Sequence, residues 1–388
     1  MSMTSRQRLV TAIEGGIPDR LPATTHHVMP YFLETYLDGI DYLRFFDRFG
    51  LDPVQWVVEH KPNEKNGEYY DPLQEEPGFL QPRWICSDNW RIRSESIPDQ
   101  QYHTVRYSFI TPGKTLSMVI QSDKHTSWVT ERLVKEKSDI DIIADYTPAP
   151  LCDVEEVNRQ AEEFGEQGLV RGMIPGFDVY GQPGCWQDAA VLFGIQNLIM
   201  ATFDDPSWVH AFLQILEKRK AEYIQSMEGA QYDILELGGG DASSTVISPE
   251  ILEEFVVPYD RRLTELAHKS EQRIVYHTCG GMMAFLETLV GIGAEALETF
   301  TPPSMGGDTR LSEAKNRVGD QVAMIGGFDQ FHYFQGCSPE ETRDAVRRCF
   351  EAAGEGGGYI LSPSDHFFDA EPELIAAYAE EARNCKYQ

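Results

Sequence analysis

The sequence predicts an α/β fold, a (β/α)₈ barrel formed by a single domain over residues 1–388, and three observations lead to it. From about residue 150 onward, short apolar runs alternate with longer amphipathic stretches, which is typical of parallel strands covered by helices. With two further candidates near the amino terminus the apolar runs number eight, which favours a closed barrel over an open sheet. No glycine-rich phosphate-binding motif follows the first run, so a nucleotide-binding sheet loses its main support.

The predicted strands and helices have recognisable boundaries. The six later strands are each followed by glycine, proline or polar loop residues. Ser248-Pro249 and Ser338-Pro339 place a capping residue and a first-turn proline before helical patterns, and Ser338 with Glu341 has capping-box spacing. The predicted strands are residues 20–25, 53–58, 169–174, 233–237, 273–277, 295–300, 321–325 and 359–361.

Residues 60–130 interrupt this alternation. They are rich in Trp, Tyr and Pro and contain short alternating runs around residues 91–94 and 104–110. Alternation with a period of two indicates strands that are buried on one side. We therefore expect an antiparallel insertion after the second barrel strand, which forms a lid or a wall.

The composition excludes several classes of function. Asp and Glu total 62 against 33 Lys and Arg, a formal net charge of −29, and such a field repels nucleic acid at long range. The chain has no apolar run of membrane-spanning length, and its start does not resemble a signal peptide, so we expect a cytoplasmic protein. The seven cysteines are an odd, scattered set and are interpreted as reduced thiols. A homodimer is compatible with these features.

The strongest local signal for chemistry is the pair His277 and Cys279, at the end of the fifth predicted strand. Residues two apart in a strand point the same way, and barrel enzymes build their sites at the carboxyl ends of their strands. An imidazole and a thiolate that converge there suit Zn²⁺. Gly280 and Gly281 permit a sharp turn directly after them. The alternative is a core histidine beside a buried cysteine.

Further ligands have to come from neighbouring strand ends. Glu298 lies late in the next strand, Asp365 and His366 follow the last one, and Glu236 and Asp241 flank the glycines after the fourth. A carboxylate in a mostly apolar barrel strand is costly unless it is paired or bound to metal. The alternative for Glu236 and Glu298 is an outward position bonded to a helix, and for Asp365 and His366 it is a polar loop.

Other side chains are candidates for substrate contacts. His26 and His27 follow the first predicted strand, and one of them is expected to point into the barrel mouth for acid–base chemistry or substrate orientation. Tyr180, Trp186 and the aromatic insertion are candidates for an aromatic wall, although aromatic residues more often belong to the core.

Taken together, the motifs resemble the uroporphyrinogen decarboxylase superfamily, particularly its corrinoid-linked methyltransferase branch. The matching segments run in order over nearly the whole chain, and residues 60–130 are the least similar part. The matching segments are PDRLP (18–22), ISPE through Pro258 (247–258), HTCG (277–280), GGD (306–308), GGFD (326–329) and GGGYILSPS (356–364).

The resemblance implies a (β/α)₈ barrel and a catalytic zinc bound by H-x-C and a later cysteine, often with a carboxylate. His277 and Cys279 match this motif, and Glu298 is placed as the carboxylate ligand. The later cysteine is replaced by Asp365 or His366, and the sequence does not decide between them. No D-x-H-x-x-G signature is present, so a corrinoid is expected on a separate carrier protein.

These observations predict a zinc-dependent methyltransferase that moves a methyl group between a small methylated substrate and the cobalt of a corrinoid protein. The aromatic insertion favours an aryl methyl ether, with His27, Tyr180 and Glu236 as substrate contacts. One alternative is a metal-independent decarboxylase or lyase that uses Asp241 and His26. It is disfavoured because residues 23–30 lack the arginines of the decarboxylase. The other alternative is a non-catalytic ligand-binding barrel.

Overall fold

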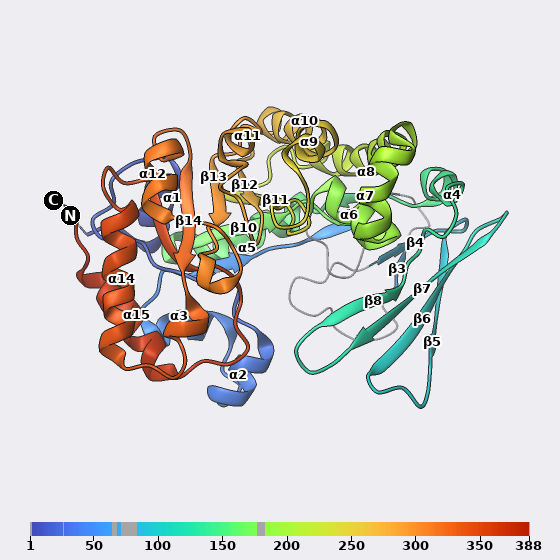
Figure 1. The fold of residues 1–388 in the computed structure, drawn as a ribbon. Helices are drawn as coiled ribbons and strands as arrows, with labels where there is room; N and C mark the ends of the chain where they lie inside the picture. Colours follow the sequence, from blue (N-terminus) through green and yellow to red (C-terminus); the bar gives the residue numbers. More distant parts are fainter. Residues whose placement is uncertain (1, 26, 64–67, 71–83, 177–182, 388) are drawn as a thin grey trace.

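The centre of the molecule is a seven-stranded parallel sheet, shown in Figure 1. The computed structural model describes residues 2–25, 27–63, 68–70, 84–176 and 183–387. All seven later strand predictions are confirmed within a few residues at their ends. The strands in sheet order are β1 (Val54–Trp56), β10 (Leu169–Met173), β11 (Ile234–Gly238), β12 (Ile274–His277), β13 (Ala296–Thr299), β14 (Ala323–Phe328) and β15 (Tyr359–Pro363).

The first predicted strand, residues 20–25, is reduced to one parallel bridge between Ala23 and Leu361 of β15. The backbone N–H of Thr24 donates to Leu361, and the N–H of Asp52 donates to the carbonyl of Ala23. Pro22 supplies no N–H to a ladder, which fits the short pairing. The segment therefore joins β15 to the chain entering β1, and the sheet is barrel-like with seven full strands rather than eight.

Alternating side chains divide the sheet into an inner and an outer face. On β10, Leu169 and Met173 belong to a small apolar cluster that also contains Leu9 and Ile13 of helix α1 (Ser5–Ile13). Val170 lies between them in sequence and belongs to the large outer core. The inner cluster also includes Val54, Ile234, Val275, Ala296, Ala323 and Ile360 from the other strands. Helix α1 thus closes one end of an apolar barrel interior.

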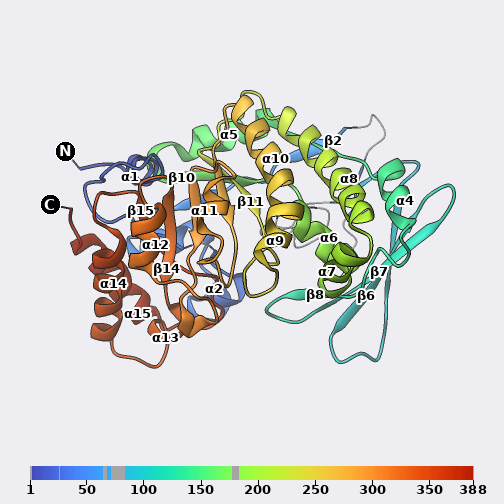
Figure 2. The same cartoon turned by 45° about the horizontal axis from the view of Figure 1, so that its top comes forward.

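Helices pack against the outer face of the sheet (Figure 2). Among the residues that the structure describes, no helix combines the length and apolar composition needed to cross a lipid bilayer. The remaining helices are α2 (Pro30–Tyr36), α3 (Tyr42–Phe49), α4 (Asp139–Tyr146), α5 (Val154–Phe164), α6 (Cys185–Phe193), α7 (Ile195–Asp204), α8 (Pro206–Gln225), α9 (Pro249–Ile251), α10 (Val257–Lys269), α11 (Leu286–Val290), α12 (Leu311–Val318), α13 (Gln330–Tyr333), α14 (Pro339–Ala353) and α15 (Pro372–Asn384).

Both predicted helix starts are confirmed. The Ser338 hydroxyl accepts the N–H of Glu341, whose carboxylate accepts the N–H of Ser338, a complete capping box on α14. Ser248 caps α9 through the N–H of Ile251. A π-helical turn, Leu252–Val256, joins α9 to α10, directly before Pro258, whose missing N–H interrupts the regular helical pattern.

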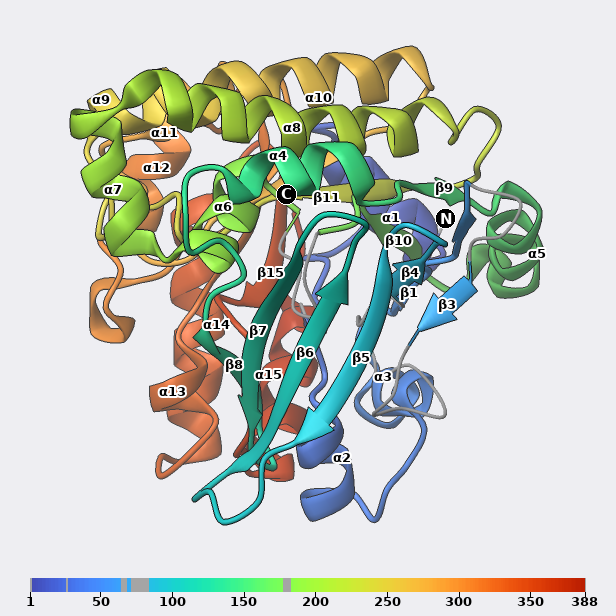
Figure 3. The same cartoon turned by 90° about the vertical axis from the view of Figure 1, so that its right-hand side faces the viewer.

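The insertion after β1 is confirmed as antiparallel sheet. Its four-stranded part, at the right in Figure 1 and in front of the barrel in Figure 3, is ordered β5-β6-β7-β8. Its inner face is apolar, with Trp90, Phe109 and Met118 all buried. The strands of the insertion are β2 (His60–Pro62), β3 (Glu68–Tyr70), β4 (Trp84–Cys86), β5 (Arg91–Ser96), β6 (His103–Ile110), β7 (Thr115–Ser122), β8 (Ser127–Glu131) and β9 (Pro150–Cys152), which pairs with β2.

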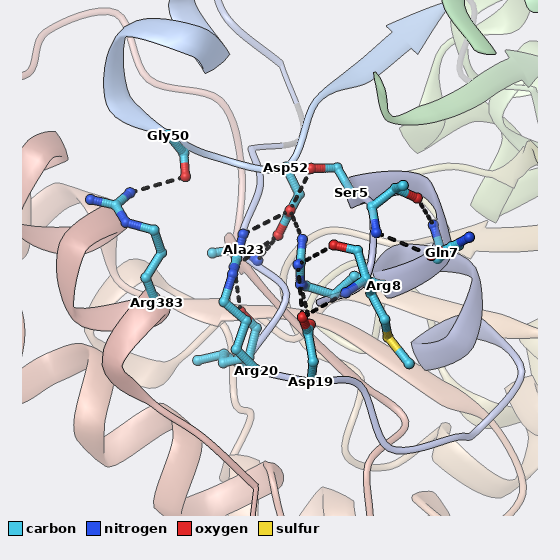
Figure 4. Close-up of polar contacts among 12 residues, drawn as sticks. Ser5, Gln7, Arg8, Asp19, Arg20, Ala23, Gly50, Asp52 and Arg383 are labelled. Atoms are coloured by element: carbon cyan, nitrogen blue, oxygen red, sulfur yellow. Dashed lines mark hydrogen bonds and ion pairs between the residues drawn. The ribbon is translucent and has the colours of Figure 1, made fainter. Parts of the chain in front are cut away.

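A buried ion cluster fixes the amino-terminal segment to the start of β1 (Figure 4). Asp52 is fully buried and accepts hydrogen bonds from Arg8 at 2.6 Å, Arg20 at 2.9 Å and the N–H of Ala23 at 3.1 Å. Arg8 also bonds Asp19 at 2.7 Å. One carboxylate therefore holds the residue 18–22 motif, helix α1 and the bridging residue Ala23 together.

Replacing Asp52 with Asn is expected to lower the free energy of unfolding by about 3–5 kcal/mol, because the buried Arg8 and the half-buried Arg20 lose their shared counter-charge. Urea unfolding followed by circular dichroism measures this change. Arg159→Ala on α5 is the control, since Arg159 forms exposed pairs with Glu156 and Glu163, and a change within about 0.5 kcal/mol is expected. Equal losses in the two variants would contradict the role of Asp52.

Candidate active site

A buried arginine lies at the centre of the barrel interior, one layer above the apolar cluster. Arg171 on β10 is 4% exposed and donates to Glu298 of β13 at 2.8 Å and to Glu236 of β11 at 2.5 Å. Its guanidinium carbon lies 4.4 Å from the ring centre of Trp56 on β1. Both glutamates point inward, so the outward position considered for them from sequence is wrong.

His277 on β12 lies between this arginine cluster and Cys279. Its Nδ1 is 2.9 Å from Oε1 of Glu298, and its Nε2 is 3.0 Å from Sγ of Cys279. The predicted convergence of His277 and Cys279 at a strand end is therefore present in the structure. A carboxylate on Nδ1 sets the ring orientation and leaves Nε2 directed at the thiol, the arrangement that a metal-binding histidine uses.

The electrostatics of this centre leave one negative charge to be neutralised. Arg171 pairs with two glutamates, and although burial opposes its charge, the two carboxylates outweigh burial and raise the pKa of Arg171. Burial also opposes an imidazolium at His277, yet Cys279 and the carboxylates outweigh it and raise the pKa of His277 well above its usual range. Burial raises the pKa of the Cys279 thiol, against the effect of His277. The cluster therefore favours a positive charge at His277, which either a protonated imidazole or a bound cation supplies.

Asp365 and His366 border the same centre. The Nδ1 of His366 is 2.8 Å from Oδ1 of Asp365. Asp365 is close enough to help raise the pKa of Cys279, and His277 opposes protonation of His366. Burial lowers the pKa of His366, but Asp365 outweighs it and leaves a net increase. Both residues follow β15, as predicted, and lie beside the His277–Cys279 pair.

The other predicted site residues have different positions. His27 is half-buried and stacks on Trp56 with ring centres 5.1 Å apart, so it lies on the arginine side of the centre. His26 and Tyr180 lie outside the described residues. Trp186 is 1% exposed in α6 and packs near Phe255, so it belongs to the core rather than to an aromatic wall. Its indole N–H donates to the carbonyl of Asp241.

Asp241 follows β11 and is held by Gln187 of α6. The Gln187 amide donates to Oδ2 of Asp241 at 3.1 Å, and its oxygen accepts the N–H of Asp241 at 2.9 Å. Burial raises the pKa of Asp241, and Gln187 partly opposes this. The residue is therefore a carboxyl group that retains a proton more readily than usual, beside the loop that follows Gly238.

The backbone at these strand ends is strained. Gly280 has φ +84°, and a Cβ there would meet Thr245 Oγ1 at 2.8 Å, so the predicted need for glycine after Cys279 is confirmed. Thr299, directly after Glu298, has φ 90°, which is rare for a β-branched residue. Its hydroxyl donates to the carbonyl of Thr278 at 2.6 Å. Such strain concentrates at functional sites.

Three buried side chains have the spacing of a metal site. One ligand atom each of Glu236, His277 and Glu298 lies within 4.8 Å of the others. The Arg171 guanidinium already bonds both glutamates, and a cation placed between them would meet that positive charge at close range. Nε2 of His277 and Sγ of Cys279 face each other away from Arg171. This pair combines a borderline and a soft ligand, which fits Zn²⁺.

Arg171 is not among the site residues predicted from the sequence, although it lies in a correctly predicted strand. The available signal was a charged residue at an alternate, inward position of an otherwise apolar strand, which requires an internal counter-charge. Which glutamates supply that counter-charge depends on the neighbouring strands, and sequence spacing does not give it.

The fold and this buried polar centre define a parallel α/β barrel with its site at the strand ends. A family model described as "Uroporphyrinogen decarboxylase (URO-D)" matches residues 181–385, more than half of the 388 residues. The chain therefore belongs to the uroporphyrinogen decarboxylase family. The match contains β11 to β15 and with them Glu236, His277 and Glu298.

Individual relatives include decarboxylases and a methyltransferase. The chain is 30% identical over 184 residues to uroporphyrinogen decarboxylase from Chromohalobacter salexigens, covering 46% of this chain and 49% of that protein. It is 26% identical over 180 residues to methylated-thiol–coenzyme M methyltransferase from Methanosarcina mazei, covering 46% and 45%. These matches therefore span about half the length of the curated relatives.

The fold resembles a solved structure over nearly its whole length. A methyltransferase from Methanosarcina mazei covers 99% of both chains with a TM-score of 0.62 and 14% sequence identity. At this identity the likeness shows the fold, and it includes the region before residue 181 that the family model does not match.

Behind the site, the outward residue Tyr276 anchors β12 to α10. The Tyr276 hydroxyl donates to Oδ2 of the fully buried Asp260 at 2.7 Å. Burial raises the pKa of Asp260 from 3.8 to about 6, although Tyr276 and Lys220 oppose this, while Glu217 adds to the increase. Asp260 is therefore protonated in the folded chain at pH values where it is ionised in the unfolded chain.

This raised pKa predicts that Asp260 stabilises the fold most below pH 4 and that its contribution is lost as the pH rises to about 6. In Asp260→Asn this loss is absent. The stability difference, variant minus wild type, should therefore rise by about 2 kcal/mol between pH 4 and pH 7. Urea unfolding at four pH values measures it, with the exposed Asp145→Asn as control. A difference that stays constant with pH would refute the assignment.

Proposed function

We propose that this chain is a zinc-dependent methyltransferase whose metal is bound by His277 and Cys279. The observation that carries the proposal is the position of His277, with Glu298 on Nδ1 and the Cys279 thiol 3.0 Å from Nε2. A divalent metal bound to a neutral imidazole and a thiolate carries one net positive charge, and it would replace the proton that the cluster otherwise favours on His277. The family membership and the similarity to a methylated-thiol methyltransferase support the reaction class.

The chain's own residues have distinct roles in this proposal. Arg171 fixes Glu298, which orients His277, so the ligand ring is held before any metal binds. Asp365 or His366 completes the ligand set in place of the cysteine of relatives. When bound, zinc supplies Lewis acidity toward the heteroatom of a methylated substrate or a thiolate. The buried surroundings exclude water and position the reactants.

We further propose that the methyl acceptor is the cobalt of a corrinoid on a separate carrier protein. The methyl carbon leaves its heteroatom without the bonding electrons, which stay on that heteroatom together with a proton taken from the site or from water. The reduced cobalt supplies the electron pair of the new bond. Two exposed apolar side chains are suited to contact a carrier, Phe203 of α7 (71% exposed), between β10 and β11, and Phe331 of α13 (53% exposed), between β14 and β15.

Purified wild-type protein is expected to hold close to one zinc per chain, and Cys279→Ala is expected to lose most of it. Elemental analysis after gel filtration in chelator-free buffer provides the measurement. Cys337→Ala is the matched control, because Cys337 is a half-buried thiol that contacts Thr342 instead. Equal zinc in wild type and Cys279→Ala would remove the assignment.

Further variants locate the metal within the cluster. If His277 and Cys279 hold it, Glu236→Gln retains zinc, and Glu298→Gln weakens zinc binding about 10–100-fold through the orientation of His277. A metal among Glu236, His277 and Glu298 would instead be lost in both. Of Asp365→Ala and His366→Ala, one should lower zinc affinity strongly and the other weakly, and no effect from either would place the third ligand elsewhere.

Methyl transfer should require four components together, namely zinc-loaded enzyme, a methyl donor, a corrinoid and a reductant that keeps its cobalt reduced. The cobalt absorption spectrum reports the reaction. Phe203→Ser should slow transfer to carrier-bound corrinoid and leave transfer to free corrinoid unchanged. Failure with methyl ethers, methylamines, methanol and methyl thioethers, and with several carriers, would contradict the proposal.

A second candidate is a metal-independent decarboxylase, and the raised pKa of Asp241 is the observation that favours it. A buried, easily protonated carboxyl group is suited to proton donation. This alternative predicts activity on a carboxylated substrate that survives chelation and Cys279→Ala but is lost in Asp241→Asn.

A further inference from the structure

A continuous series of ring contacts leads outward from the arginine centre. Trp56, which covers Arg171, stacks on His27, and His27 lies 6.5 Å from His366, between ring centres. His366 in turn lies 5.1 Å from Phe368 in an edge-to-face arrangement. His366 contacts Asp365 at 2.8 Å, and both are proposed metal ligands, so this series passes the proposed metal site and follows the loop after β15.

The series continues onto the inserted sheet. Phe368 lies 4.8 Å from His125, in the turn between β7 and β8, and His125 meets Tyr31 of α2 edge-to-face at 4.5 Å. The ammonium group of Lys124 donates to the Tyr31 hydroxyl at 3.0 Å and lies 4.6 Å from the Tyr31 ring centre. The turn of the insertion is therefore attached to the helix that follows the first barrel segment, beside which it lies in Figure 3.

These outer rings are not part of the hydrophobic core. Phe367 is 2% exposed and packs edge-to-face on Phe32 in the core, whereas its neighbour Phe368 turns the other way and is half-buried. The side chains of His125 and His366 are 29% and 38% exposed. Tyr31 is also half-buried. Four partly exposed rings from three separate segments thus form one surface, which folding alone does not require.

The turn that presents His125 is rigid. The Asp123 carboxylate accepts the N–H groups of His125 at 2.8 Å and of Thr126 at 2.9 Å, and the Asp123 N–H donates to the Thr126 carbonyl. This is an Asx turn that closes the hairpin. Held in addition by Lys124 on Tyr31, the turn keeps the His125 ring in one position, and such preorganisation lowers the cost of binding a ligand against it.

We infer that this aromatic surface, formed by Tyr31, His125, His366 and Phe368, binds the aromatic ring of the methyl donor, a neutral aryl methyl ether. The inference rests on the proposed function and adds the substrate class to it. Edge-to-face and offset contacts make aromatic rings better partners than aliphatic groups of equal area. Asp123 and Asp369 lie close to Lys124, which removes the preference that a lone lysine would give to an anion.

The chemistry of an aryl ether agrees with this surface. The bond between the methyl carbon and the ether oxygen breaks, and its electron pair stays on the aryl oxygen, where the ring delocalises it. That oxygen takes up a proton and leaves as a phenol. The methyl group forms its new bond with the electron pair of the reduced cobalt acceptor. A ring bound against His366 would lie beside Asp365, whose carboxylate is 2.8 Å from Nδ1 of His366, so the substrate would lie next to a proposed metal ligand.

Binding and turnover of matched donors test the inference on the full-length, zinc-loaded chain. Methoxybenzene and 2-methoxyphenol are compared with methoxycyclohexane, first by saturation-transfer NMR and then by KM in the corrinoid assay. The aryl donors should bind at least tenfold more tightly. Phe368→Ala and His125→Ala should each weaken aryl binding about tenfold and leave the alkyl donor unchanged. Tyr102→Ala is the control, since Tyr102 packs on Trp128 elsewhere in the same insertion.

The outcomes separate this inference from the proposed function. Equal binding of aryl and alkyl donors, or aryl binding that is unchanged in both Phe368→Ala and His125→Ala, would overturn the aromatic site. Methyl transfer from alkyl donors would then still support the methyltransferase. Selective, Phe368-dependent aryl binding without any methyl transfer would support the aromatic site and contradict the proposed reaction.

Discussion

The site depends on the buried ion pairs between the guanidinium of Arg171 and the carboxylates of Glu236 and Glu298. The guanidinium is buried inside the barrel and bonds glutamates from two other strands, and one of these glutamates holds His277. A buried arginine without these carboxylates would be strongly destabilising, and the carboxylates without arginine would repel each other. The orientation of His277, and through it the approach of Cys279, therefore follows from a charge balance that four strands make together.

The barrel interior has two layers with different tasks. Near α1 the inward residues are apolar and pack as an ordinary core, which fixes the distances between strands. One layer further along the strands, inward positions of β10, β11, β12 and β13 carry charged or titratable side chains, and Trp56 covers the arginine there. The close-packed apolar layer fixes the positions of the strands. The charged layer depends on this, because hydrogen bonds tolerate only small changes in distance and angle.

The site and the aromatic contacts beside it come from two parts of the chain, one inside and one outside the segment that the family model matches. The family model covers β11 to β15, where the histidine and both glutamates lie. The rings that continue from Trp56 to Tyr31 come partly from the inserted hairpin and from α2, outside that match. Loops and insertions on a shared barrel are where substrate preference usually varies.

The sequence by itself determined the seven full strands, the antiparallel insertion, the helix caps and the pairing of His277 with Cys279. Each is encoded over a few residues, by apolar alternation, capping chemistry or a spacing of two. Only the tertiary structure decided that residues 20–25 form a single bridge, that Trp186 is core, and that Glu236 and Glu298 share Arg171. These outcomes depend on which strands become neighbours and on how charges balance inside the closed interior, and neither is written in local spacing.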